Sequence, residues 1–187
     1  MKGQWLAIAF CGVVFSCDYH SNNLCHEGSR SKTYDFEGLE VYGTIEDGLR
    51  CAQAQQKPIF LLFSGFACVG DNSYEERLFV SRRNRKIIKQ NYIPVILYVD
   101  DKTKLDSSDI GYRTYGGKRR KIETVGAKNS HYEMEEFRMN TQPLLIILDH
   151  NGQPITEPIG YEPGTSTYQK YLEHGLLRYQ QDAKANN

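Results

Sequence analysis

The sequence has no surplus of charge of either sign and no internal repeat or low-complexity segment. Its 23 basic side chains are matched by 23 acidic ones, so no long-range field attracts polyanions and we expect no nucleic-acid partner. The basic run at 118–121 is interpreted as a solvated loop. The G-x-x-x-x-G-K motif is also missing, which argues against phosphate-loop chemistry.

A membrane-spanning run is missing as well. The apolar run at 5–15 has only about eleven residues, whereas a transmembrane helix needs roughly 20. Together with the positive start at Lys2, it predicts an export signal over residues 1–17. The residues ending in Cys17 resemble the lipobox of bacterial lipoproteins, so we expect lipidation of Cys17 and a place in the periplasm or cell envelope of a bacterium; plain secretion is the alternative.

Cysteine is scarce, with five residues at positions 11, 17, 25, 51 and 68. Removal of the signal and lipidation of Cys17 leave three, an odd number worth attention in an oxidising compartment. The ligand types at Cys17, His20, Cys25 and His26 would suit zinc, but their spacing is cramped. We therefore expect no metal and no other cofactor.

The chain length of 187 residues and its 40% hydrophobic content fit one globular domain. Polar residues 18–34 predict a flexible tether before a domain at 35–180, and 181–187 predict a disordered tail. Within the domain, the patterns predict a short edge strand near 39–43, a helix at 44–56 capped by Thr44, and buried strands near 58–65, 92–101 and 143–148. A tight turn at Asn151-Gly152 predicts an antiparallel hairpin with a last strand near 154–160. Helical spacing at 73–78, 81–90, 129–140 and 166–180 predicts further helices, and residues around 102–128 are interpreted as an inserted loop. This order predicts an α/β three-layer sandwich with a central mixed sheet flanked by helices.

One cysteine, Cys68, lies at a position where a reactive thiolate is favoured. Cys68 follows the apolar run "PIFLLFSG" and is expected at the opening of a helix, where unpaired N–H groups and the helix dipole stabilise a thiolate. The alternative is an inert cysteine at a strand end.

Three stretches resemble one known family. They are "KPIFLLFSGFACVGD", "YIPVILYVDD" and "NTQPLLIILDHNGQPI", and together they make the chain similar, over about residues 40–178, to thioredoxin-like domains. The resemblance is to the C-terminal domain of bacterial thiol:disulfide interchange proteins of the DsbD type. It implies the thioredoxin-like form of the sandwich predicted above.

The resemblance also implies a site. Cys68 matches the family's attacking cysteine, and Pro143 matches the cis-proline beside it, with a trans proline as the alternative. Thr141 and Gln142 would line the substrate edge. Phe66 and Ala67, which precede the cysteine in the turn, complete the expected substrate-binding surface.

The departure from the family is Asp71, which stands where the resolving cysteine would be. A carboxylate cannot attack a mixed disulfide, and its charge should oppose formation of the Cys68 thiolate. Cys51, beside alanines in a helix, is interpreted as buried packing. A disulfide between Cys25 on the tether and Cys68 is a hypothesis prompted by the odd cysteine count.

Two functions follow. The first is monothiol exchange at Cys68 with protein thiols or disulfides of the cell envelope, completed by an external thiol or a membrane electron donor. The second is a non-catalytic module that holds an extended partner peptide in the groove between the Cys68 turn and the Pro143 loop.

Overall fold

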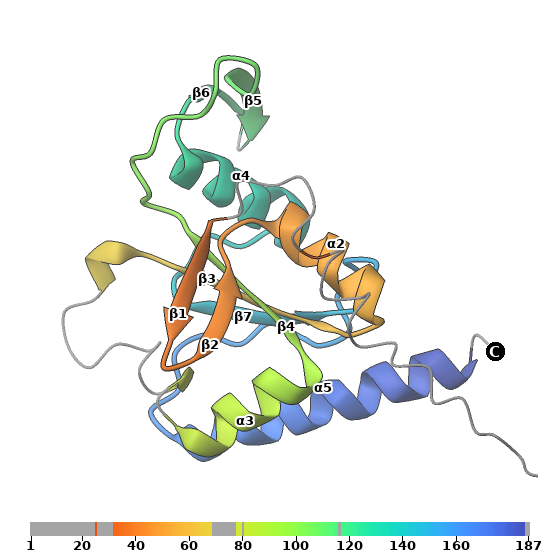
Figure 1. Cartoon of the computed structure of the whole chain (residues 1–187). Helices are drawn as coiled ribbons and strands as arrows, with labels where there is room; N and C mark the ends of the chain where they lie inside the picture. Colours follow the sequence, from red (N-terminus) through yellow and green to blue (C-terminus); the bar gives the residue numbers. More distant parts are fainter. Residues whose placement is uncertain (1–24, 26–31, 69–77, 80, 116, 186–187) are drawn as a thin grey trace, which may run out of the picture.

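The computed structural model describes residues 25, 32–68, 78–79, 81–115 and 117–185. A central five-stranded mixed sheet has the order β1-β2-β4-β3-β7 (Figure 1). The strands are β1 Thr33–Phe36, β2 Leu39–Tyr42, β3 Ile59–Ser64, β4 Ile93–Tyr98 and β7 Leu144–Leu148. Strands β2, β4 and β3 run parallel, whereas β1 and β7 are antiparallel to their neighbours.

Helices cover both faces of this sheet, which gives the three-layer α/β sandwich predicted from the sequence. The helices are α2 Ile45–Gln55, α3 Arg82–Asn91, α4 Val125–Phe137 and α5 Thr165–Ala185. Helices α2 and α4 pack on one face, and α3 and α5 pack on the other. None of the helices within the described residues is both long and apolar enough to span a bilayer.

Strands β3, β4 and β7 are buried along their whole length on both faces, which explains their continuous apolar sequences. In β3, Phe60 and Leu62 point to the layer of α3 and α5, and Leu61 and Phe63 point to the layer of α2 and α4. Each face of the sheet thus has its own hydrophobic core.

Threonine begins the two helices of one layer. The hydroxyl of Thr44 accepts a hydrogen bond from the Asp47 N–H at 3.2 Å, and that of Thr124 accepts one from the Ala127 N–H at 3.2 Å. These bonds satisfy N–H groups that a helix start otherwise leaves unpaired. The predicted start of the first helix is confirmed, but the helix expected at 129–140 begins earlier, at Val125.

Three other predictions need correction. The strand at 39–43 is not an edge, because β1 pairs with its outer side. Much of the inserted loop is an antiparallel hairpin of β5 Gly111–Tyr115 and β6 Lys118–Ile122, so the basic run lies in a strand and not in a loop. The last strand, expected near 154–160, contributes only isolated antiparallel bridges to β7, because Pro154 and Pro158 have no N–H to donate to a ladder.

Gly175, which interrupts the pattern of the terminal helix, has a packing reason. It is buried in α5, and a Cβ at this position would meet the side chain of Ile147 in β7 and lie 3.0 Å from the hydroxyl of Tyr92. The absence of a side chain lets α5 approach the sheet closely.

We expect Gly175→Ala to destabilise the protein by about 1–3 kcal/mol, because overpacking outweighs the gain of about 1 kcal/mol in helix propensity. Urea unfolding measures this change. A matched control is Gly164→Ala, whose added Cβ makes only ordinary contacts at 3.8 Å and should change stability by less than about 0.5 kcal/mol. Equal stability of the two variants would contradict the packing argument.

Candidate functional site at the carboxyl ends of the central strands

The register of the sheet brings the two halves of the predicted site to one edge. Phe63 pairs with Leu144 across β3 and β7, so the chain leaving β3 and the chain entering β7 lie together. A short 3-10 helix, η1 Phe66–Cys68, follows β3 at this edge. Pro143 immediately precedes β7, and its peptide bond with Gln142 is cis, as the resemblance implied.

Cys68 is the last residue of η1. Asp71 and Cys17 lie outside the described residues, so their predicted roles stay predictions. The attacking role of Cys68 likewise stays a prediction; the structure shows that Cys68 ends the short helix after β3, at the sheet edge where Pro143 precedes the neighbouring β7.

The turn is held by a carboxylate that the sequence analysis did not single out. Asp100 follows β4, and its two oxygens accept hydrogen bonds from the N–H groups of Phe66 at 2.8 Å and Ala67 at 2.9 Å. The first N–H groups of η1 are therefore paired, whereas the helix opening that was predicted to stabilise a Cys68 thiolate lies outside the described residues. The sequence holds a signal for this contact, because the two acids of "YVDD" follow a buried strand. Neighbouring parallel strands end at the same edge of the sheet, so these acids lie near the turn that follows β3.

The next acid ties the N-terminal part of the chain to this edge. Asp101 is buried and forms an ion pair with Lys32 at 2.5 Å, and it also accepts the Thr103 N–H at 2.8 Å. Burial alone would raise the pKa of Asp101, but the hydrogen bonds from Lys32 and Thr103 outweigh it and lower the pKa. Asp101 is thus held ionised beside Asp100.

An aromatic pair forms the exposed rim of the site. The ring of Phe66 stacks on that of Tyr98, with centroids 3.9 Å apart and planes inclined by 12°. Phe66 remains 44% exposed, whereas Tyr98 is buried. Phe66 and Ala67 are both exposed at the turn, as a substrate-contacting role requires.

The loop before Pro143 is anchored from below by Glu133 of α4. This side chain is fully buried, and its carboxylate accepts the Thr141 N–H at 2.9 Å and the Gln142 side-chain amide at 2.7 Å. The amide of Gln142 therefore points toward α4 and not toward a substrate, which corrects part of its predicted role. Thr141 is exposed, but its N–H is already used by Glu133.

Sequence reasoning missed Glu133, although a signal was present. Gly126, Asn129 and Glu133 share the buried side of α4, where apolar residues would be usual. Asn129 donates to the Tyr98 carbonyl at 2.9 Å. Polar residues at buried positions of a helix indicate partners on a neighbouring segment, here the end of β4 and the cis-proline loop.

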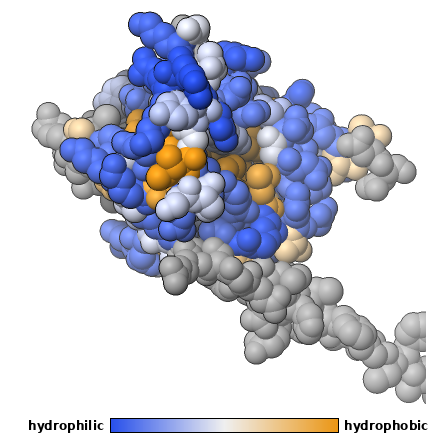
Figure 2. Space-filling view, turned by 90° about the horizontal axis from the view of Figure 1, so that it is seen from above, coloured by the Kyte–Doolittle hydropathy of each residue, from blue (hydrophilic) through white to orange (hydrophobic). Residues whose placement is uncertain are grey.

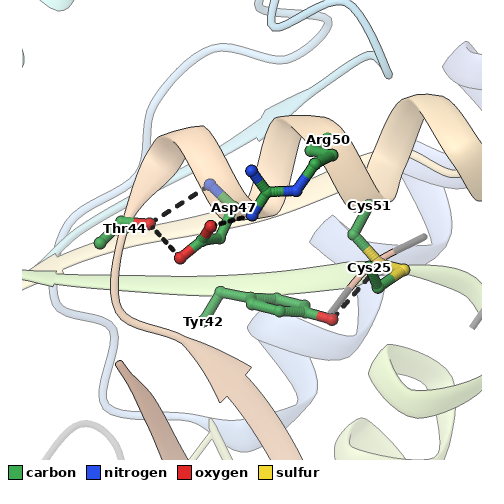
Figure 3. A network of polar contacts seen from close by, with 6 residues as sticks. All are labelled: Cys25, Tyr42, Thr44, Asp47, Arg50 and Cys51. Carbon is green, nitrogen blue, oxygen red and sulfur yellow. Dashed lines mark hydrogen bonds and ion pairs between the residues drawn. A yellow bond between two sulfur atoms is a disulfide. The ribbon is translucent and has the colours of Figure 1, made fainter. Parts of the chain in front are cut away.

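The cysteine pairing differs from the hypothesis. Cys25 forms a disulfide with Cys51 of α2 and not with Cys68, and both of these cysteines are buried (Figure 3). The Tyr42 hydroxyl donates to the Cys51 sulfur at 3.4 Å, and the Gln55 amide lies 3.3 Å from each sulfur. Cys51 is buried, as predicted, but it is a cross-link. It cannot resolve a mixed disulfide at Cys68 while it remains oxidised.

A separate group of contacts holds the start of the same helix, α2. Thr44 bonds to Asp47 through its hydroxyl at 2.8 Å, and Arg50 pairs with the same carboxylate (Figure 3). The bridge joins residues 26 positions apart. It therefore fixes a point of the expected N-terminal tether against the domain.

With this geometry described, comparison with known proteins gives the class. The chain belongs to the thioredoxin-like domain family, whose model matches residues 45–176. No curated protein matches the chain.

Comparison with solved structures gives two matches among others. The chain resembles a protein described as "DsbH Oxidoreductase" at 16% identity and a TM-score of 0.51, over 79% of this chain and 92% of the other. A thioredoxin-fold protein from Helicobacter pylori matches at 15% identity and a TM-score of 0.40, over 68% and 86% of the respective chains. At 16% identity, the first of these likenesses shows the fold alone.

We expect the double variant Cys25→Ser/Cys51→Ser to lose about 3 kcal/mol of unfolding free energy, because the unfolded chain is no longer closed into a loop. Each single variant should lose a similar amount, and reductant should bring the wild type to the same level. Urea unfolding provides the measurement. Cys68→Ser is the matched control and should leave the stability sensitive to reductant. If reductant leaves the unfolding free energy of the wild type unchanged, the pairing of Cys25 with Cys51 is wrong.

Glu133 makes stability depend on pH. Burial raises its pKa in the folded protein, and the bonds from Thr141 and Gln142 offset only part of this rise. The folded state then keeps a proton that the unfolded chain has lost, so the contribution of Glu133 to stability is fully present below the unfolded pKa of about 4.3 and is lost as the pH rises through the folded value.

We therefore expect the stability of the wild type relative to Glu133→Gln to fall as the pH rises above the unfolded pKa of about 4.3. Denaturant unfolding at a series of pH values above this point tests the slope. Glu136→Gln, on the exposed side of the same helix, removes an equal charge and serves as the control. A rise in relative stability with pH would show that the carboxylate is held ionised.

Proposed function

We propose that this protein exchanges thiols and disulfides with partner proteins of the bacterial cell envelope by a monothiol mechanism at Cys68. The observation that carries the proposal is that Cys68 ends the short helix after β3, at the same sheet edge where the cis-Pro143 precedes the paired strand β7. Membership in the thioredoxin-like family supports it. A likeness to a structure named an oxidoreductase is consistent with it.

The chemistry balances without a second cysteine in the turn. The Cys68 thiolate attacks one sulfur of the partner's disulfide; that bond breaks, the other sulfur leaves as a thiolate and takes a proton from water. An external thiol then attacks the Cys68 sulfur and releases the partner as a reduced thiol. A second external thiol attacks the first one in its mixed disulfide with Cys68 and releases the Cys68 thiolate. The two external thiols are thereby oxidised to a disulfide, which accounts for the two electrons that reduce the partner.

The residues around Cys68 have supporting roles in this proposal. Asp100 holds the turn through the Phe66 and Ala67 N–H groups, and Glu133 holds the cis-proline loop through Thr141 and Gln142. The exposed ring of Phe66 offers an apolar contact to the partner segment beside its sulfur. Asp71, in place of a resolving cysteine, is what makes the mechanism monothiol.

The location follows from the N-terminal sequence and remains part of the proposal. Export through residues 1–17 and lipidation of Cys17 would tether the domain to a membrane facing the periplasm. The disulfide between Cys25 and Cys51 fits an oxidising compartment.

A second candidate is a module that holds an extended partner peptide without redox turnover. One observation favours this candidate: the Asp100 carboxylate already accepts the N–H groups of Phe66 and Ala67, which leaves fewer hydrogen-bond donors to stabilise a thiolate. In that case the aromatic rim and the cis-proline loop bind the peptide, and the sulfur takes no part.

We expect the reduction of a glutathione mixed disulfide, with an external thiol as reductant, to fall to background in Cys68→Ser. The control is Lys170→Ser, an exposed position of α5 away from the site that keeps the thiol; it should retain activity within roughly threefold, as an exposed substitution usually does. Mass spectrometry should trap the mixed disulfide on Cys68 in the wild type and in Lys170→Ser, but not in Cys68→Ser. Activity that survives in Cys68→Ser excludes the mechanism, and unchanged partner binding with no turnover in the wild type favours the binding module.

A further inference from the structure

The β5–β6 hairpin concentrates positive charge in a protein whose charges balance overall. Its residues 111–122 contain five cations and no acid, whereas the whole chain has 23 of each sign. The cations are Arg113, Lys118, Arg119, Arg120 and Lys121. The hairpin lies beyond α4, at the opposite end of the molecule from α3 and α5 (Figure 1). The face that it occupies is predominantly hydrophilic (Figure 2).

The hairpin is an exposed platform attached at its base. The β6 residues before Ile122 are exposed, whereas Ile122 is 7% exposed and joins the hairpin to the body. Arg119 lies over the ring of Tyr112, with its guanidinium carbon 4.4 Å from the centroid. This contact holds a cation in place on the surface of the hairpin.

Only part of this charge is neutralised nearby. Lys121 forms an ion pair with Glu123 at 2.7 Å, and Glu123 also lies 3.5 Å from Lys104. Among the described residues, no carboxylate pairs with Arg113, Lys118 or Arg119. The outer part of the hairpin therefore keeps a positive potential.

The base of the hairpin adjoins the candidate site. A pocket of about 320 Å³ is lined by Arg120 and Lys121 of the hairpin and by Asp100. Asp100 is the residue whose carboxylate holds the Phe66 and Ala67 N–H groups of the Cys68 turn. The base of the hairpin and the residue that holds this turn therefore line the same pocket.

We propose that the β5–β6 hairpin docks an acidic, extended segment of the partner protein next to the sulfur that reacts with Cys68. The inference rests on the proposed function for the reacting sulfur, but the docking itself needs no redox step. Carboxylates are the complementary groups, because arginine binds them in a bidentate manner. Opposite charges on the two partners also speed their encounter.

The register favours a peptide over a flat anionic surface. Arg113 stands opposite Arg120, and Arg119 stands opposite Thr114, so neighbouring cations project from opposite faces of the hairpin. Arg120 also lines a pocket. A bilayer surface meets one face at a time and cannot enter such a pocket, whereas the side chains of an extended segment can.

Fluorescence anisotropy with a short labelled peptide of alternating Glu and Gly, without cysteine, tests the docking. We expect binding to weaken roughly tenfold in Lys118→Ser/Arg119→Ser/Arg120→Ser, because each exposed charge contributes only a small factor to the affinity. The control Arg82→Ser/Arg83→Ser/Lys86→Ser removes equal charge from α3 and should bind like the wild type. The Gln counterpart of the peptide should bind none of the three proteins.

The readouts separate the possible failures. Equal weakening of peptide binding in both triple variants means that only net charge matters, and it overturns the proposal. The proposal is also overturned if the hairpin binds phosphatidylglycerol vesicles or single-stranded DNA but does not bind the peptide. If the triple variant does not fold by circular dichroism, Lys118→Glu alone provides the same comparison. Because the peptide has no sulfur, hairpin-dependent binding with no turnover at Cys68 supports the docking and contradicts only the proposed function.

Discussion

The pairing of β3 with β4 and β7 is the constraint on which the site depends. Ser64 pairs with Tyr98 on one side, and Phe63 pairs with Leu144 on the other. Three chain segments far apart in sequence therefore emerge at one edge: the Cys68 turn, the acids after β4 and the cis-proline loop. Burial of these strands on both faces sets the register, because a shift of one residue would turn core side chains of each strand to the wrong layer.

Carboxylates organise the backbone at this edge. Asp100 pairs the first N–H groups of η1, and Glu133 pairs the chain before Pro143. Neither segment can satisfy these groups within a helix or strand of its own, so side chains from β4 and α4 supply the acceptors. Two loops that would otherwise be independent are thus fixed to the same scaffold, which is the arrangement that a site for an extended partner requires.

The fold was largely predictable, because its signals are local. Continuous apolar runs gave the inner strands, and Thr44 gave the start of α2. The β5–β6 hairpin was not predicted, since most of its residues bury nothing and so show no apolar period. The irregular pairing of 154–160 was not predicted either. The Asn151-Gly152 turn correctly predicts that this segment returns along β7, but two prolines interrupt the ladder.

By itself the sequence determined the layers of the sandwich, the position of Cys68 after a buried strand, and the presence of an acid at position 71, because composition and periodicity are properties of neighbouring residues. Only the tertiary structure decided which cysteines pair, where Asp100 and Glu133 direct their oxygens, and that the basic run stands on a hairpin beside the site. These outcomes depend on which segments meet after folding, and that meeting is set by the packing of the whole sheet and its helices.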